Sequence, residues 1–288
     1  MSLASADTLP GEFAFTDADF EALARLARSE YGLSLASSKK PLVYSRLARR
    51  LRARGLATFR DYMSLLNRAE EAEERLELVS ALTTNVTSFF REKHHFETLR
   101  SALFPELATQ KRIRIWSAGC SSGQEPFSIA MTLLDGLPPG ARDMRILATD
   151  IDPAILRKAR AGRHPAEECA TVPDEFRARW LRPVPGEPDL VEMGAELKAL
   201  VSFAELNLIC DWPFAGPFDA IFCRNVAIYF DQETQQQLWS RFADKLRAGG
   251  FLFIGHSERL SGAALPEFET AGVTTYRKRA TPGPARPT

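Results

Sequence analysis

The sequence is poor in cysteine, has no excess of either charge and contains no long apolar run, and each absence argues against a class of protein. Its four cysteines (Cys120, Cys169, Cys210 and Cys223) are scattered, with no C-x-x-C pair and no histidine at metal-ligand spacing, which argues against disulfides and zinc. Acidic and basic residues both number 37, so a general nucleic-acid binder is not indicated. No segment approaches the ~18 apolar residues of a membrane span, and residues 1–5 do not resemble a secretory signal. We therefore expect a cytoplasmic protein with no metal, no bound nucleic acid and no direct membrane insertion.

What is present indicates a folded chain with a small helical domain before a larger one. Hydrophobic residues make up 45% of the 288 residues and charged residues 26%, which are ordinary values for a globular protein. Residues 1–14 look like a flexible leader. Apolar side chains then recur at helical spacing through residues 15–82, with Thr16 and Thr58 as candidate caps and no strand pattern. We predict an all-α N-terminal domain there, followed by a linker and connecting helix over residues 83–110.

Residues 111–279 alternate between strand-like and helical segments, which predicts a mainly parallel sheet covered on both faces. The expected strands lie at 112–117, 145–149, about 200–206, 218–223 and 251–255, with helices near 125–135, 153–162 and 232–248. Gly249 and Gly250 are expected to end the last of these helices. Proline-rich residues 165–199 interrupt the alternation and are expected to form an inserted small β subdomain. Residues 280–288 are expected to be a disordered tail.

Residues 113–134 carry the pattern that says most about function, because they predict a strand, a tight glycine turn and a helix. Gly119 and Gly123 bracket the turn, an arrangement that points backbone N–H groups at a ligand. Asp150 ends the next strand, where its carboxylate can accept hydrogen bonds from ribose hydroxyls. A dinucleotide site requires G-x-G-x-x-G and an acid ~20 residues later, whereas here Asp150 follows Gly119 by 31 residues. The segment favours S-adenosylmethionine, with a dinucleotide enzyme and a ligand-free turn as open alternatives.

Three further strings are far more specific than the glycine turn. They read T-T-N-V-T-S-F-F-R-E at 83–92, F-D-A-I-F-C-R-N-V at 218–226 followed by I-Y-F, and G-H-S-E at 255–258. In these strings the chain resembles the CheR family of chemotaxis receptor glutamate O-methyltransferases, over about residues 15–278. The resemblance implies a Rossmann-like, S-adenosylmethionine-dependent methyltransferase that methylates glutamates in the cytoplasmic region of methyl-accepting receptors during sensory adaptation. The alternatives are an RNA or small-molecule methyltransferase and a non-catalytic cofactor-binding adaptor.

The resemblance also implies a set of site residues. With Gly119 of the turn, the implied cofactor-binding residues are Asn85, Thr87, Arg91, Glu125, Asp150, Asn207, Leu208, Arg224 and Asn225. Glu125 is implied to face the methionine end of the cofactor, and Asn207 and Leu208 its adenine. Arg91 and Tyr229 are the implied catalytic residues, with Tyr229 close to the transferred methyl. The insert is where family members contact the receptor, and some grip a receptor tail there; this chain departs from the family pattern at 164–165.

Several of these residues also have a purely structural interpretation. Glu125 at a helix start is stabilised by the helix dipole by ~0.3–1 kcal/mol without any ligand. Asn85 and Thr87 are typical turn residues, and Arg91 next to an acid suits an exposed ion pair worth ~0–1 kcal/mol. A buried tyrosine such as Tyr229 needs just one partner for its hydroxyl.

A basic run suggests a partner surface in the helical domain. Eight basic residues from Lys39 to Arg60 occur with no acidic residue between them. A solvated helix face is the plainer interpretation, but a basic patch on a chain of zero net charge also suits an acidic partner. We predict that Arg46, Arg49, Arg50 and Arg54 dock against the acidic methylation helices of a receptor, and we expect a monomer.

Overall fold

The computed structural model describes residues 12–137 and 143–280, which fall into two compact units. The first unit runs to Asn85 and includes Tyr229–Asp231, and the second comprises Val86–Ile228 and the chain from Gln232 onward. Most of the expected leader and of the expected tail lies outside the described residues. Within the described part of the chain, no helix has the length and apolar character needed to cross a membrane.

The first unit is built from helices whose ends are specified locally. Their bounds are α1 (Asp17–Tyr31), η1 (Ser37–Lys39), α2 (Lys40–Arg54), α3 (Phe59–Leu66) and α4 (Ala72–Leu82). The predicted cap Thr16 accepts a hydrogen bond from Asp19 N, and the Asp19 side chain bonds back to Thr16 N, which forms a capping box. Thr58 caps α3 by accepting a hydrogen bond from Asp61 N on its side chain. Phe15 and Phe59 pack at a tilt with ring centroids 4.2 Å apart in the core of this unit.

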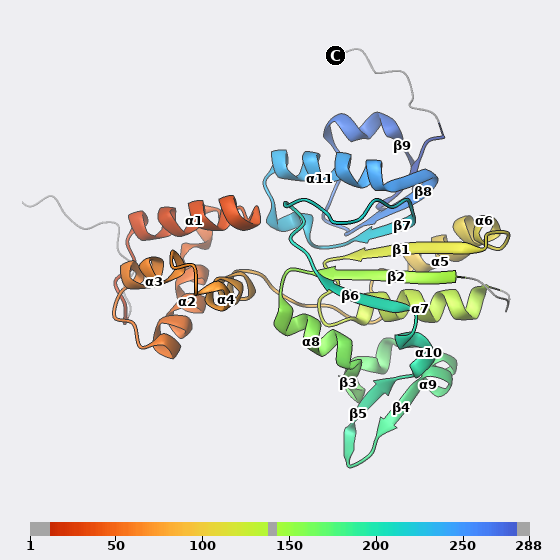
Figure 1. Cartoon of the computed structure of the whole chain (residues 1–288), viewed down its shortest axis with the longest axis horizontal. Helices are drawn as coiled ribbons and strands as arrows, with labels where there is room; N and C mark the ends of the chain where they lie inside the picture. Colours follow the sequence, from red (N-terminus) through yellow and green to blue (C-terminus); the bar gives the residue numbers. More distant parts are fainter. Residues whose placement is uncertain (1–11, 138–142, 281–288) are drawn as a thin grey trace, which may run out of the picture. The chain divides into compact units, whose positions relative to one another are not determined.

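The second unit contains a seven-stranded sheet with the order β6-β2-β1-β7-β8-β10-β9 (Figure 1). The strands are β1 (Arg112–Ala118), β2 (Asp143–Asp150), β6 (Val201–Glu205), β7 (Phe218–Cys223), β8 (Leu246–Ile254), β9 (Phe268–Gly272) and β10 (Thr275–Lys278). The first five in this order pair in parallel, and β10 joins β8 and β9 antiparallel. The predicted Rossmann-like sheet is therefore confirmed.

Helices cover both faces of this sheet. Apolar side chains of β1 point alternately to the two faces, so each face must be covered to bury them. The helices are α5 (His94–Thr98), η2 (Leu99–Leu103), α6 (Phe104–Leu107), α7 (Gln124–Gly136), α8 (Pro153–Ala161) and α11 (Gln232–Lys245), with short turns η4 (Ala227–Tyr229) and η5 (Gly262–Glu267). Ile113 and Ile115 belong to the core cluster that contains Phe127 of α7. Trp116 points to the other face, where its ring lies 5.2 Å from that of Phe242 in α11.

The inserted subdomain forms a separate three-stranded antiparallel sheet with the order β3-β5-β4. Its elements are β3 (Arg163–Pro165), η3 (Ala166–Thr171), α9 (Asp174–Trp180), β4 (Leu181–Val184), β5 (Glu187–Met193) and α10 (Ala195–Lys198). The sequence predicted the sheet but not helix α9, whose buried Phe176 and Trp180 are spaced four residues apart. These two aromatic residues explain the helix, because residues at that spacing share one helix face.

One predicted boundary is wrong. Gly249 and Gly250 do not end a helix, because α11 already ends at Lys245 and both glycines lie within β8. Gly249 has a φ of +75°, and the register between β7 and β8 shifts between the pairs Phe218–Leu246 and Ala220–Phe251, an interval that contains both glycines. The shift is held by Arg247, whose Nε donates to Asp219 Oδ1 at 2.7 Å at the start of β7. The glycines therefore form a strand irregularity rather than a helix stop.

Candidate functional site

The glycine turn and the acidic strand end predicted from the sequence meet at one edge of the sheet. Gly119 N donates to Thr149 O at 2.8 Å, and Ser121 N donates to Asp150 Oδ2 at 2.8 Å. Gly119 has a φ of +83°, and a Cβ at this position would lie 2.3 Å from Val226 Cγ2. A side chain is therefore excluded both by backbone conformation and by space, which explains the glycine.

Asp150 keeps hydrogen-bonding capacity beyond its structural contacts. Its Oδ1 accepts from Asp152 N at 3.1 Å, and the carboxylate as a whole offers about four lone-pair sites. Burial raises the pKa of Asp150, against the opposing effect of these backbone N–H groups. The cap of α8 is Asp152, which accepts from Ala154 N and Ile155 N. Because another residue caps the helix, Asp150 remains available to accept from a ligand.

Glu125 and Arg224 form a buried ion pair at the same sheet edge. Arg224 Nε donates to Glu125 Oε2 at 2.6 Å, and the two side chains are 3% and 9% exposed. Ser117 of β1 donates its hydroxyl to Glu125 Oε1 at 2.6 Å. The structure thus brings together two residues that are 99 positions apart in the chain. Each oxygen of Glu125 already has one protein partner, so the carboxylate is held in a fixed orientation.

Arg224 also anchors the segment that carries Arg91. Its Nη1 donates to the backbone carbonyl of Arg91 and lies 3.4 Å from His95 Nδ1. Burial and the nearby guanidinium lower the pKa of His95 to about 3, so this imidazole is neutral at pH 7. The Arg224 guanidinium also faces the rings of Phe96 and Phe222 at 5.6 and 5.9 Å. A neutral imidazole beside a fixed guanidinium stabilises this arrangement without like-charge repulsion.

Asn225 presents an unsatisfied polar atom at the end of β7. Its Oδ1 is buried and has no hydrogen-bond partner among the described residues. The backbone of Asn225 is left-handed, with a φ of +60°, a conformation that asparagine tolerates better than most residues. A buried acceptor without a partner suits a bound ligand, because leaving such a group unpaired costs ~1–3 kcal/mol.

The two residues predicted to lie near the adenine follow β6. Asn207 Oδ1 accepts a hydrogen bond from Ile209 N at 3.2 Å. Leu208 is 7% exposed, and its carbonyl oxygen accepts from Arg241 Nη1 at 2.7 Å. Leu206 N donates to Asp150 O at 2.9 Å, which ties this segment to the ribose candidate.

The remaining predicted residues divide between the units. Arg91 and Thr87 belong to the second unit, where Arg91 Nη1 donates to Val86 O at 3.0 Å. Asn85 and Tyr229 belong to the first unit. The Tyr229 hydroxyl donates to the carbonyl oxygen of Thr84 at 3.1 Å and accepts from its N–H at 3.0 Å. The hydroxyl therefore already has a structural role, and its role in catalysis remains a prediction.

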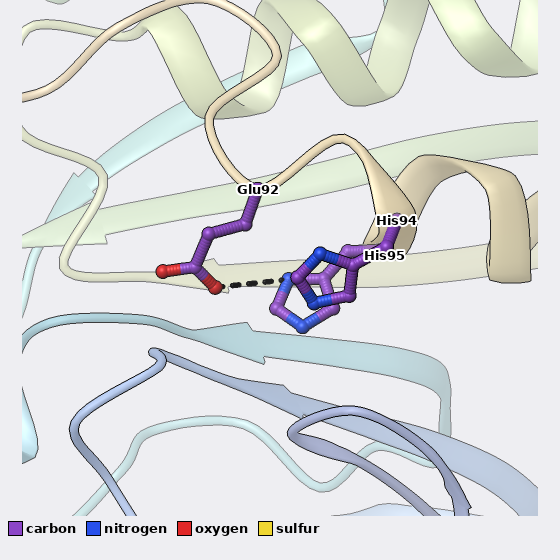
Figure 2. Close-up of side chains that lie close together, drawn as sticks. All are labelled: Glu92, His94 and His95. Atoms are coloured by element: carbon purple, nitrogen blue, oxygen red, sulfur yellow. Dashed lines mark ion pairs between the residues drawn. The ribbon is translucent and has the colours of Figure 1, made fainter.

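Among the described residues, Glu92, His94 and His95 are grouped closely enough to be considered as metal ligands. Each offers one potential ligand atom, and these atoms all lie within 4.8 Å of one another (Figure 2). Glu92 Oε2 lies 3.5 Å from His95 Nδ1, and Glu92 Oε1 lies 3.2 Å from His256 Nδ1. The Arg224 guanidinium lies 3.4 Å from the same His95 nitrogen. A cation already stands where a metal ion would approach this ligand, so we interpret the group as a polar network that holds the segment.

Two arginines of the basic run, Arg50 and Arg54, are paired with acids within α4 or just before it. Arg50 forms two hydrogen bonds with Glu74 at 2.9 and 2.7 Å and one with Glu77 at 2.8 Å. Arg54 donates to Glu71 at 2.7 Å. These acids lie outside the run in sequence but beside it in space. Arg50 and Arg54 therefore offer less free charge to a partner than the sequence predicted.

The other two predicted docking residues differ from each other. Arg46 donates to Ala81 O at 3.1 Å and to Thr83 O at 3.0 Å, so its guanidinium binds carbonyl groups at the end of α4. Arg46 and Lys39 also line an open pocket of this unit, together with Leu42 and Tyr229 among others. Arg49 is exposed and makes no ion pair within the described ranges.

Sequence reasoning missed two residues that support the site. Ser117 holds Glu125, and Glu258 accepts hydrogen bonds from the backbone of the turn that carries Asn225. Glu258 stood within the G-H-S-E string, but its burial could not be read from the sequence. Cys223, the last residue of β7, is buried, and burial raises the pKa of its thiol well above the usual range.

Comparison with known proteins matches almost the whole chain. Residues 18–83 match the family described as "CheR methyltransferase, all-alpha domain", and residues 85–277 match "CheR methyltransferase, SAM binding domain". The chain belongs to the CheR methyltransferase family. Its cofactor is therefore S-adenosylmethionine, and the unsatisfied Asn225 Oδ1 and the spare acceptor capacity of Asp150 fit a ligand of that chemistry.

Relatives within the CheR family have similar lengths. A probable chemotaxis protein methyltransferase of Rhizobium etli is 49% identical over 86% of this chain and 95% of its own length. Chemotaxis protein methyltransferase 2 of Pseudomonas aeruginosa is 45% identical over 92% and 94%. The chemotaxis protein methyltransferase of Escherichia coli is 42% identical over 91% of each chain.

Proposed function

We propose that this protein is a protein-glutamate O-methyltransferase that modifies the cytoplasmic region of methyl-accepting chemotaxis receptors, in the cytoplasm. The observation that carries the proposal is the likeness to chemotaxis protein methyltransferases over about nine-tenths of the chain. The sheet edge with Gly119, Asp150 and Asn225 supports it, because these residues offer the acceptors that a nucleoside cofactor requires.

The chemistry requires little of the protein beyond positioning. S-adenosylmethionine supplies an activated methyl group on a sulfonium. A glutamate acceptor has an ordinary pKa near 4.3 and is ionised at pH 7, so no general base is needed to prepare it. The protein must hold the carboxylate oxygen in line with the methyl group and exclude water, because charge is lost as anion and cation react.

The roles of individual residues follow from their surroundings. We assign Asp150 to the ribose, Asn207 and Leu208 to the adenine and the Glu125–Arg224 pair to the methionine end. Arg91 orients the acceptor carboxylate, a role that suits a guanidinium bound to only one backbone carbonyl, that of Val86, among the described contacts. Asn85, Thr87 and Tyr229 complete the proposed set.

The basic helix α2 is the proposed docking surface for the acidic receptor helices. Three exposed cations of the run, Lys39, Arg49 and Arg60, have no ion pair within the described ranges. Arg60 lies in α3, so Lys39 and Arg49 are the two that lie next to or within α2. Arg46 adds positive charge beside the apolar Leu42, which is 49% exposed. Such charges act mainly on encounter, through long-range attraction.

Reversing the charge of Lys39 and Arg49 to Glu should slow receptor methylation several-fold at low salt and leave the cofactor dissociation constant unchanged. The difference from wild type should fade as the screening length falls from ~10 Å at 0.1 M salt to ~3 Å at 1 M. Initial methylation rates over a salt series measure this. Arg25→Glu, at an exposed residue of α1, is the control for charge reversal away from the run. Equal rates for the double variant and wild type at low salt would show that α2 is only a solvated face.

Peptide mass spectrometry of a receptor cytoplasmic fragment after incubation with the protein and S-adenosylmethionine tests the proposed substrate. We expect methylation on glutamate side chains of the fragment. Methylation of added RNA instead, with RNA affinity that falls steeply with salt, would favour the RNA methyltransferase alternative.

A further inference from the structure

Glu258 is a carboxylate buried among backbone N–H groups. The whole Glu258 residue is only 3% exposed. Oε2 accepts from Gly255 N at 2.5 Å and Asn225 N at 3.1 Å, and Oε1 accepts from Val226 N at 3.0 Å. Oε1 also lies 3.3 Å from Ile228 N. No ion pair with a basic side chain accompanies these contacts in the described part of the chain, so the backbone N–H groups balance its charge.

These contacts hold together two segments that are distant in sequence. The donors come from the turn after β7 and from the end of β8, which are about 30 residues apart. Successive N–H groups of the turn converge on one carboxylate because Asn225 is left-handed, with a φ of +60°. A left-handed non-glycine residue is strained and persists where its surroundings determine it. Glu258 supplies those surroundings.

The turn that Glu258 holds is the one that carries the cofactor residues. Asn225 has the unsatisfied Oδ1, and Arg224 precedes it in the pair with Glu125. Val226 lies so close over Gly119 that a Cβ there would be 2.3 Å from its Cγ2. Any movement of the turn would therefore be transmitted both to Asn225 and to the glycine turn.

We propose that Glu258 is a positioning residue for cofactor binding: its carboxylate fixes the left-handed turn at Asn225 and so sets both the Asn225 amide and the contact of Val226 with Gly119. The residue does not itself touch the cofactor. The proposal rests on the assignment of Asn225 to the cofactor site made above.

Glu258→Gln is the sharpest test, because it keeps size and shape but replaces one acceptor oxygen with an NH₂ group that faces backbone donors. We expect the dissociation constant for S-adenosylmethionine to rise ~10-fold or more, in line with losing hydrogen bonds to a charged group. Amide hydrogen exchange should quicken at Asn225, Val226 and Ile228 and stay unchanged in the first unit. Glu269→Gln, an exposed glutamate of β9, is the matched control and should change neither quantity.

Calorimetric titrations of the full chain well below its melting temperature separate the outcomes. Weaker cofactor binding in folded Glu258→Gln and in Asn225→Ala would support the proposal. Weaker binding in Asn225→Ala alone would overturn it, because Glu258 would then only contribute to stability. Unchanged binding in Asn225→Ala would instead refute the assignment of Asn225. If Glu258→Gln does not fold, Glu258→Asp, which keeps the charge but loses reach, must show the same loss of affinity; wild-type affinity in Glu258→Asp would overturn the proposal.

Discussion

Replacing Arg224 by leucine should lower the free energy of unfolding by about 3–5 kcal/mol and abolish measurable cofactor binding. The substitution leaves the buried carboxylate of Glu125 without its cation, and an uncompensated buried charge is among the costliest defects in a protein. Arg224 and Glu125 are 3% and 9% exposed, so water cannot replace the lost partner. Urea unfolding gives the stability, and isothermal calorimetry gives the cofactor affinity.

The double variant Glu125→Leu with Arg224→Leu separates stability from binding. Replacing both members of a buried ion pair by apolar residues is often close to neutral for stability. We expect the double variant to regain most of the stability that Arg224→Leu loses, and we expect its cofactor affinity to stay lost. Recovered cofactor binding in the double variant would show that the pair serves folding alone. A stability loss equal to the sum of the two single losses would show that the residues are not coupled.

Asp150→Ala should weaken binding of S-adenosylmethionine and of its demethylated product by about 1.5–3 kcal/mol, which corresponds to roughly 10- to 150-fold in dissociation constant. The reason is the loss of a charged acceptor for the ribose hydroxyls, which both molecules share. Calorimetric titration with each molecule measures the effect.

Asp152→Ala is the matched control for Asp150→Ala. Asp152 caps α8, so its loss should cost about 0.5–2 kcal/mol of stability and leave cofactor affinity unchanged. Unchanged affinity in folded Asp150→Ala would remove the ribose assignment. Equal losses of affinity in the two variants would show that the effect comes from the loop rather than from the ribose.

The sequence predicted the sheet well because its pattern is local. Apolar runs alternate with helical ones, and caps such as Thr16 and Asp152 lie next to the helices that they start. Local signals failed at Gly249, where a strand irregularity depends on the distant contact between Arg247 and Asp219.

The parts of the candidate site that could not be predicted depend on pairing across long sequence separations. Arg224 and Glu125 are 99 residues apart, and nothing in either neighbourhood indicates that they meet. Arg50 and Glu74 are 24 residues apart, which is why the basic run looked unopposed in the sequence. Charge balance and burial are properties of the folded chain and cannot be read from local sequence. The site residues were predicted only because the motif strings resemble those of a known family.

The most direct test of the proposed function is transfer of a labelled methyl group from S-adenosylmethionine to a receptor cytoplasmic fragment. We predict label on the fragment that mild base releases as volatile methanol, as expected for a methyl ester, and we predict none when the fragment's methylated glutamates are replaced by alanine. Asp150→Ala should transfer label far more slowly than wild type when the cofactor concentration is below the variant's dissociation constant. Base-stable label, or no transfer to a folded fragment by protein that binds the cofactor, would contradict the account.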